Sequence, residues 1–174
     1  IEGSSPFYAV TKKFHNALHG KSETFSQDMF DLFMEMGRRN AQRLTLDDEL
    51  VLIHDPQPIT LVETRSRHRA SRWVWRCHVD VSRPNAEVWN FLRPFILQFD
   101  AAIYSAPAFT QPMEMRQVLI APSIDPFSEK NRELSKEEVD AALHRLAIPR
   151  DVPILTQVSR FDYLKDPVGV IEVF

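Results

Sequence analysis

Apolar residues recur at helical spacing in two segments near the start of the chain. The apolar face of the first predicted helix is made by Phe7, Val10, Phe14 and Leu18. We expect Ser5 to cap this helix, Pro6 to take its first helical position and Gly20 to end it. Methionine and phenylalanine side chains form a similar stripe over residues 26–44, which predicts a second helix. Both stripes are typical of helices that pack on a core.

Short, continuous apolar runs follow these helices and predict buried strands. The runs are ELVLIH, WVWRCH, AAIYSA, QVLIAPSID and PILTQVSRF. Helical segments are predicted between and after them, as a brief helix over 59–64, a helix over 85–98 with a kink or break at Pro94, the segment SKEEVDAALHRLAI, and a short helix at the end. Ser135 and Glu138 have the spacing of a capping box. Continuous apolar strands that alternate with helices predict an α/β fold, a Rossmann-like parallel sheet with helices on both faces.

Polar residues gather where the predicted strands end. The segments are His54-Asp55-Pro56-Gln57, Arg76-Cys77-His78-Val79-Asp80, Ser159-Arg160-Phe161-Asp162 and, with a milder character, Pro122-Ser123-Ile124-Asp125. Parallel sheets bind ligands beyond the carboxyl ends of their strands. The pattern therefore predicts a ligand cleft at this edge of the sheet.

Each of these groups also has a structural interpretation. Residues 54–56 can form a simple turn after a strand. His78 can be a core histidine, with Asp80 as a carboxylate at the start of a helix. Arg160 and Lys165 can be solvated charges in a turn between strand and helix. These alternatives stay open from the pattern alone.

Composition narrows the classes of protein. The chain has 174 residues, 44% hydrophobic and 26% charged, which is typical of a folded domain and excludes disorder. A net charge of −3 gives no overall basic field, so we expect no nucleic-acid partner, while a small anionic ligand remains possible. The basic run at 65–72 is interpreted as a solvated loop. Only four glycines are present, and no glycine-rich phosphate loop is found.

The single cysteine and the distribution of apolar residues bear on location. With Cys77 alone, the chain cannot form an internal disulfide or a cysteine-rich zinc site, which fits a reducing compartment. No apolar run reaches the length of a membrane span, and the first residues lack the basic and apolar regions of a signal peptide, so we expect none. We expect a cytoplasmic protein with no membrane partner.

Several segments together resemble one known family. The segments are AVTKKFHNALHG, VLIHDPQP, WVWRCHVDVSRPNAEVWNFLRPF, IAPSIDPFSEKN and ILTQVSRFDYLKDPVGVIEVF. In this order they resemble the glycosyl-transferring trehalose synthases of glycosyltransferase family four, which have the GT-B architecture of two Rossmann-like domains. The resemblance implies transfer of glucose from a nucleoside diphosphate glucose to free glucose, with retention, giving trehalose. It implies neither a metal nor a cofactor.

The resemblance also implies roles for individual residues. His78 resembles the family's histidine beside the donor sugar, and is the expected catalytic residue. Arg160 and Lys165 resemble the cations that bind the donor diphosphate. The remaining expected substrate contacts are Asp55, Gln57, Arg76 and Asp80. Ser123 and Asp125 lie where the family turns toward its second domain, and receive no chemical role.

The same resemblance predicts how the chain is organised. Residues 1–148 would be an N-terminal domain without its first strand or strands, with the linker, and 149–174 the first strand and a truncated helix of a C-terminal nucleotide-binding domain. We expect the chain to be an inactive piece of a longer enzyme. The apolar residues Val168, Val170, Ile171 and Phe174 are expected to dock on the first domain or on a second copy, so a homodimer is among the expected partners.

Two alternatives remain beside this interpretation. A trehalose phosphorylase would share the architecture and the acceptor side, but would use phosphate. A non-catalytic α/β domain for sugar binding or oligomerisation would keep the fold without turnover.

Overall fold

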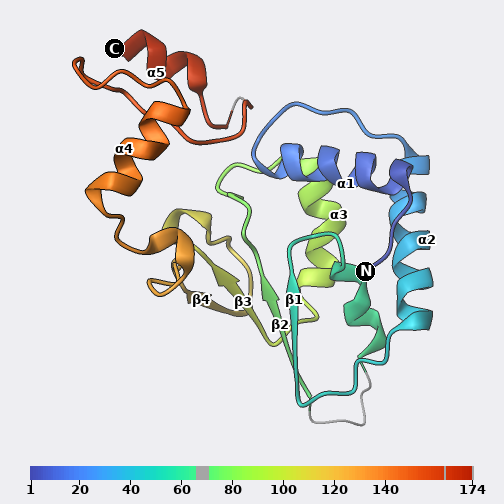
Figure 1. Ribbon diagram of the computed structural model, residues 1–174. Helices are drawn as coiled ribbons and strands as arrows, with labels where there is room; N and C mark the ends of the chain where they lie inside the picture. Colours follow the sequence, from blue (N-terminus) through green and yellow to red (C-terminus); the bar gives the residue numbers. More distant parts are fainter. Residues whose placement is uncertain (66–70, 163, 174) are drawn as a thin grey trace. The chain divides into compact units, whose positions relative to one another are not determined.

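The computed structural model describes residues 1–65, 71–162 and 164–173 (Figure 1). It divides into two compact units, Ile1–Ser123 and Ile124–Phe174. The division comes earlier in the chain than the domain boundary predicted at 148/149. The division only separates groups of contacts within this chain. The domain boundary of a longer protein therefore stays a prediction.

The first unit contains a four-stranded parallel sheet. Its strands are β1 (Leu50–His54), β2 (Arg72–Arg76), β3 (Ala101–Tyr104) and β4 (Arg116–Leu119), and they lie in the order β1-β2-β3-β4. All four were predicted from their apolar runs, although each hydrogen-bonded strand is shorter than its run. The α/β class and the parallel sheet are confirmed.

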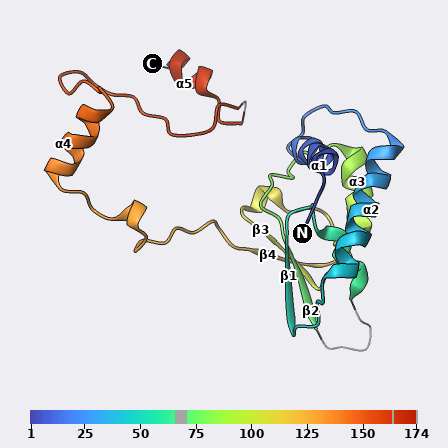
Figure 2. The same cartoon turned by 45° about the vertical axis from the view of Figure 1, so that its right-hand side comes forward.

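Three α-helices gather on one side of this sheet in both views (Figures 1 and 2). They are α1 (Ser5–Leu18), α2 (Gln27–Arg43) and α3 (Ala86–Ile96). The short 3-10 helices η1 (Ile59–Thr64) and η2 (Pro107–Phe109) lie in the connections. The helices of this unit cover one face of the sheet. On the opposite face, Leu50 and Leu52 of β1 are 61% and 45% exposed.

The ends of these helices are set by local side chains. Ser4, and not the predicted Ser5, caps α1, because its hydroxyl accepts a hydrogen bond from the backbone N–H of Phe7 over 3.3 Å. Asn85 caps α3 by accepting the backbone N–H groups of Glu87 and Val88. The helix continues past Pro94 to Ile96, so Pro94 does not break it.

The core lies between the sheet and these helices. Trp73 and Trp75 of β2 are fully buried, since alternate residues of a strand point to the same face. Phe14, Phe33 and Phe91 join α1, α2 and α3, with ring centroids 5.0–5.8 Å apart. Aromatic contacts of this kind add to the stability that apolar burial supplies.

The second unit consists of short helices joined by extended chain. Its elements are η3 (Glu129–Asn131), α4 (Lys136–Arg145) and α5 (Pro167–Val173). The predicted capping box of α4 is confirmed, with Ser135 and Glu138 each bonded to the other's backbone. The strand predicted over 153–161 was wrong, because a parallel strand needs a neighbouring strand and the described part of this unit contains none. None of its described residues is buried.

Candidate functional site

The ends of β1 and β2 form the candidate site of the first unit. His54 is the last residue of β1 and lies in register with Arg76, the last residue of β2. The backbone N–H of Asp55 donates to the carbonyl of Arg76 over 2.9 Å, which continues the pairing one residue further. The two polar segments predicted to meet therefore do meet.

Asp55 leaves β1 in an unusual backbone conformation. Its φ of 61° lies in the left-handed region, which aspartate tolerates better than most residues. Its carboxylate oxygen Oδ1 accepts the backbone N–H of His78 over 2.8 Å, and its carbonyl accepts the indole N–H of Trp75 over 3.0 Å. Backbone strain of this kind clusters at functional sites and is maintained by surrounding contacts.

His78 reaches back from the end of β2 to His54. Nδ1 of His54 and Nε2 of His78 lie 2.8 Å apart, and the two ring planes differ by 12°. Both side chains are exposed. The interpretation of His78 as a core histidine was therefore wrong.

Arg76 makes internal contacts. The residue is 7% exposed, and its guanidinium donates to the carbonyls of Tyr104 and Ile120 and to Oγ of Ser105, over 2.8–3.3 Å. These acceptors follow or end β3 and β4, so Arg76 fixes three strand ends against one another. A sugar contact by Arg76 stays a prediction.

Asp80 lies beside the end of α1. Its Oδ1 accepts the backbone N–H of Ser82 over 2.9 Å, which forms a local turn. Burial and the nearby His15 lower the pKa of His19, the C-cap residue of α1, while the negative charge of Asp80 opposes that shift. Sequence reasoning missed His19, because nothing in its local pattern indicates that α1 ends near residue 80.

The remaining residues of the polar strand-end segments differ in their burial and contacts. Gln57 is half-buried, and no hydrogen bond of its side chain appears among the described residues. Cys77 is buried, and burial raises the pKa of its thiol to about 12, so it is not a nucleophile at neutral pH. Ser123 and Asp125 lie at the division between the units, where Asp125 accepts the backbone N–H of Phe127.

The two predicted diphosphate ligands lie in the second unit. Arg160 is paired with Asp162 over 3.2 Å, and its side chain is 75% exposed. Lys165 lines an open cavity of about 590 Å³ together with residues of α5. Their joint action on one ligand stays a prediction.

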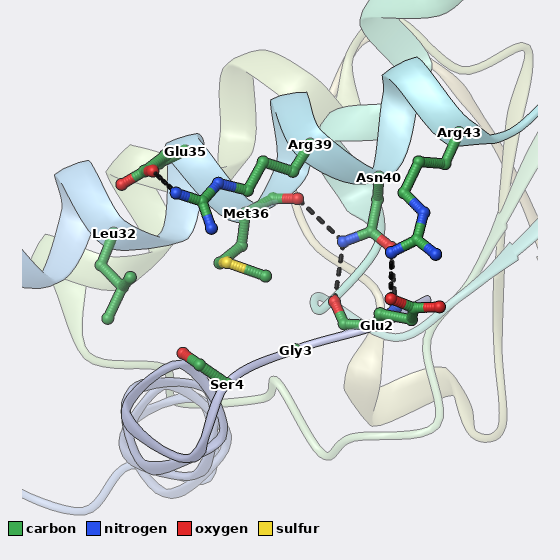
Figure 3. A pocket seen from close by; sticks show the side chains of 9 residues that line it. All are labelled: Glu2, Gly3, Ser4, Leu32, Glu35, Met36, Arg39, Asn40 and Arg43. Carbon is green, nitrogen blue, oxygen red and sulfur yellow. Dashed lines mark hydrogen bonds and ion pairs between the residues drawn. The ribbon is translucent and has the colours of Figure 1, made fainter.

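A second cavity lies away from the strand ends, between the N-terminal stretch and α2 (Figure 3). It measures about 380 Å³. The buried Asn40 binds both backbone polar groups of Glu2, over 2.7 and 2.8 Å, and also the carbonyl of Met36. Arg39 and Arg43, which also line it, are paired with Glu35 and Glu2. Its polar groups thus hold the first residues of the chain against α2.

The basic run lies only partly within the described residues, since 66–70 fall outside them. At its two ends, Arg65 binds both carboxylate oxygens of Asp100 over 3.0 and 2.9 Å, and Arg72 lies 3.7 Å from the same carboxylate. Arg65 is therefore a structural residue and not part of a solvated loop.

Two kinds of feature are absent from the described residues. No group of three or more His, Cys, Asp or Glu side chains is placed to hold a metal ion in the parts of the chain that the structure describes. Within the same residues, no helix is both long enough and apolar enough to cross a membrane.

Comparison with known proteins identifies the family of this chain. The family model described as "Trehalose synthase, N-terminal domain" matches residues 1–111, which include His54, Asp55 and His78. The chain belongs to the trehalose synthase N-terminal domain family.

Curated relatives named trehalose synthase extend the similarity. The protein of Thermococcus litoralis is 43% identical over 178 residues, and that of Pyrococcus horikoshii is 44% identical; each match covers 100% of this chain. The protein of Rubrobacter xylanophilus is 41% identical over 99% of the chain.

The chain spans only part of these relatives, between 42% and 43% of their length. A solved structure described as "OtsA apo structure" has a similar fold, with a TM-score of 0.56 and 17% identity. That likeness covers 70% of this chain and 35% of the solved chain. The predicted relationship to trehalose synthases is confirmed, with the family model covering residues 1–111. Membership of glycosyltransferase family four and the use of a nucleotide sugar stay predictions.

Proposed function

We propose that this chain is part of a retaining glucosyltransferase of GT-B architecture, which transfers glucose from a nucleoside diphosphate glucose to glucose and forms trehalose. The longer protein that would contain the chain is called the parent below. The observation that carries the proposal is the hydrogen bond that joins Asp55 and His78 at one edge of the sheet, in a member of the trehalose synthase N-terminal domain family.

The site at the ends of β1 and β2 offers complementary groups for a sugar. The Asp55 carboxylate can accept hydrogen bonds from sugar hydroxyl groups, and an imidazole N–H of His78 can donate to a sugar oxygen. Both residues are held by the sheet, because the His78 backbone is bonded to Asp55 and Asp55 is bonded to β2. Preorganised groups of this kind favour a transition state without reorganising at the moment of reaction.

Arg160 and Lys165 supply the charge that the leaving group requires. A departing nucleoside diphosphate gains negative charge, which cations stabilise directly. No metal or further cofactor is required by this scheme.

The proposed partners are the nucleotide sugar and glucose. A second copy of the chain is a further candidate partner, because it would cover the exposed apolar residues Val168 and Ile171. The proposed location is the cytoplasm, where nucleotide sugars are available.

The test is product analysis of the parent. It is incubated with a panel of nucleoside diphosphate glucoses and with glucose that carries ¹³C, and the products are read by NMR. We expect trehalose with one labelled ring, in the configuration that retention produces. Absence of any disaccharide with every donor would contradict the proposal. The 174-residue chain is assayed in parallel and should give no product, and turnover by this chain would contradict its assignment as an inactive part.

The phosphorylase alternative is read in the same assay. Trehalose with inorganic phosphate, and without nucleotide, would give glucose 1-phosphate if the parent were a phosphorylase. We expect no release of glucose 1-phosphate under these conditions, because we assign Arg160 and Lys165 to the binding of a nucleoside diphosphate.

A further inference from the structure

We infer that His54 is a positioning residue for His78, and that its Nδ1–H donates to Nε2 of His78. His78 then carries its own proton on Nδ1 and presents that N–H as a donor. No role was predicted for His54 from the sequence. The direction of the bond between the rings rests on the proposed function, because Nδ1 of His78 can donate to a sugar only if its Nε2 accepts from His54. The coupling of the two rings rests on geometry alone.

The geometry of the two rings indicates a directional hydrogen bond. The ring centroids lie 5.1 Å apart, which exceeds the 2.8 Å between Nδ1 of His54 and Nε2 of His78 by about one ring width. With planes only 12° apart, the rings therefore lie edge to edge and nearly in one plane, not face to face. The N–H of one ring then points along the lone pair of the other.

This contact decides the role of the second nitrogen of His78. A neutral imidazole has one donor and one acceptor nitrogen, and the bond made by one nitrogen fixes the state of the other. If Nε2 of His78 accepts from His54, Nδ1 of His78 must be the donor. Asp55 cannot set this choice through its observed contact, because it binds the backbone N–H of His78 and not the ring.

The sheet holds both rings in place. His54 ends β1 in register with Arg76, and the backbone of His78 is bonded to Asp55. Both rings are exposed, so water competes for the bond and the preference for one tautomer is expected to be modest, roughly three- to tenfold. A ligand that excluded water from this edge would strengthen the preference.

The first test reads the tautomer directly in the 174-residue chain. Ring ¹⁵N shifts of His78 are measured by long-range ¹H–¹⁵N NMR at about pH 8.5, where a histidine of ordinary pKa is neutral. We expect the Nδ1–H form of His78 to be more populated than in a free histidine, where the Nε2–H form prevails. His54→Ala should reduce the ratio of the Nδ1–H to the Nε2–H form by roughly three- to tenfold. A tautomer ratio of His78 in the unaltered chain equal to that of a free histidine, or an unchanged His78 spectrum in His54→Ala, would overturn the inference.

Two further variants separate the contact from general disturbance. The side-chain nitrogen of asparagine can take the place of Nδ1, so His54→Asn should keep the Nδ1–H form of His78. The nitrogen of glutamine lies nearer the place of Nε2, so His54→Gln should not. His144→Ala, in the last turn of α4, serves as the matched control and should leave His78 unchanged. If His54→Asn behaved as His54→Ala does, the inference would be overturned.

The second test reads the consequence in the parent. His54→Ala should lower kcat by roughly three- to tenfold with little change in KM for either sugar, and His54→Asn should restore most of it. A parent that transfers no glucose at all would refute the proposed function, while the NMR arm would still decide the coupling of the rings. Normal kcat in His54→Ala, beside a changed tautomer, would overturn the link to catalysis.

Discussion

The backbone N–H of His78 donates to Oδ1 of Asp55 over 2.8 Å, so the first residue after β1 holds the second residue after β2. Asp55 takes a left-handed backbone conformation at this point, with a φ of 61°. The conformation turns the carboxylate toward the neighbouring strand end instead of along β1. Two residues far apart in sequence thereby become one site, and a change in either is expected to affect the other.

His78→Ala tests the role of the imidazole in the parent. We expect turnover to fall by roughly a hundredfold or more, because a donor to the reacting sugar acts mainly in the transition state, while nucleotide affinity stays nearly unchanged. The side chain is exposed, so the free energy of unfolding should change by no more than about 0.5 kcal/mol. Steady-state kinetics and urea unfolding measure both. A loss of stability that accounted for the lost activity would instead support a structural role.

Asp100→Asn should destabilise the first unit in a pH-dependent way. Burial alone would raise the pKa of Asp100, but the N–H of Trp73 and the guanidinium of Arg65 bring it below its ordinary value of 3.8. A lowered pKa in the folded state gives stability that is present above the unfolded pKa, about 4, and is lost as the pH falls through the folded pKa. At pH 7 the variant should lose about 1 to 2 kcal/mol, allowing for a carboxylate that is 26% exposed.

Urea unfolding at pH 7 and at about pH 3 measures this difference. The gap between Asp100→Asn and the unaltered chain should shrink at the lower pH, because protonation already weakens the native contacts there. Glu63→Gln, at an exposed position in η1, is the matched control and should show no such change. A gap of equal size at both pH values would contradict the assignment.

The sequence predicted the four strands of the first unit because each is a continuous apolar run next to turn-forming residues. It also predicted that Asp55 and His78 meet, since the carboxyl ends of parallel strands share one edge. It could not predict that Arg76 turns inward, because an arginine at a strand end can contact a ligand or, equally, the carbonyls of neighbouring strands.

The strand predicted over 153–161 shows the converse limit. Its apolar pattern is that of a buried strand, yet in the structure Val158 and Phe161 are exposed and no strand forms. A local apolar pattern indicates that a segment can form a strand when a neighbouring strand pairs with it. No such neighbour is among the described residues of this unit.

Gly37→Ala should destabilise the chain although alanine normally favours a helix. An added methyl group on Gly37 of α2 would lie 2.1 Å from Oγ1 of Thr60 in η1, far inside contact distance. Thr60 is buried and branched at Cβ, so it has little room to move, and we expect a loss of about 1 to 3 kcal/mol. Thermal or urea unfolding of the 174-residue chain measures it.

A double-mutant cycle with Thr60→Ala identifies the cause. The buried hydroxyl of Thr60 has no hydrogen-bond partner among the described residues, so removing it should cost little by itself. Gly37→Ala combined with Thr60→Ala should then recover part of the loss, since the contact at 2.1 Å is gone while Cβ of residue 60 stays 3.0 Å away. Additive losses in the double variant would show that the packing of α2 against η1 is not limited by this contact.

Arg160→Ala and Lys165→Ala test the proposed donor site in the parent. Each charge-assisted contact contributes about 1.5 to 3 kcal/mol, so either change should weaken binding of a nucleoside diphosphate by roughly ten- to a hundredfold. Turnover should fall further as charge develops on the leaving group, while glucose affinity should hardly change. Arg160 must exchange its present partner Asp162, which lies 3.2 Å away, for the phosphate.

Calorimetry with the nucleoside diphosphate and with glucose measures both affinities. Lys136 is an exposed cation at the start of α4, so Lys136→Ala is the control for general charge. Unchanged diphosphate affinity in both variants would return Arg160 and Lys165 to solvated surface charges, whereas an equal loss in Lys136→Ala would show attraction by net charge rather than a defined site.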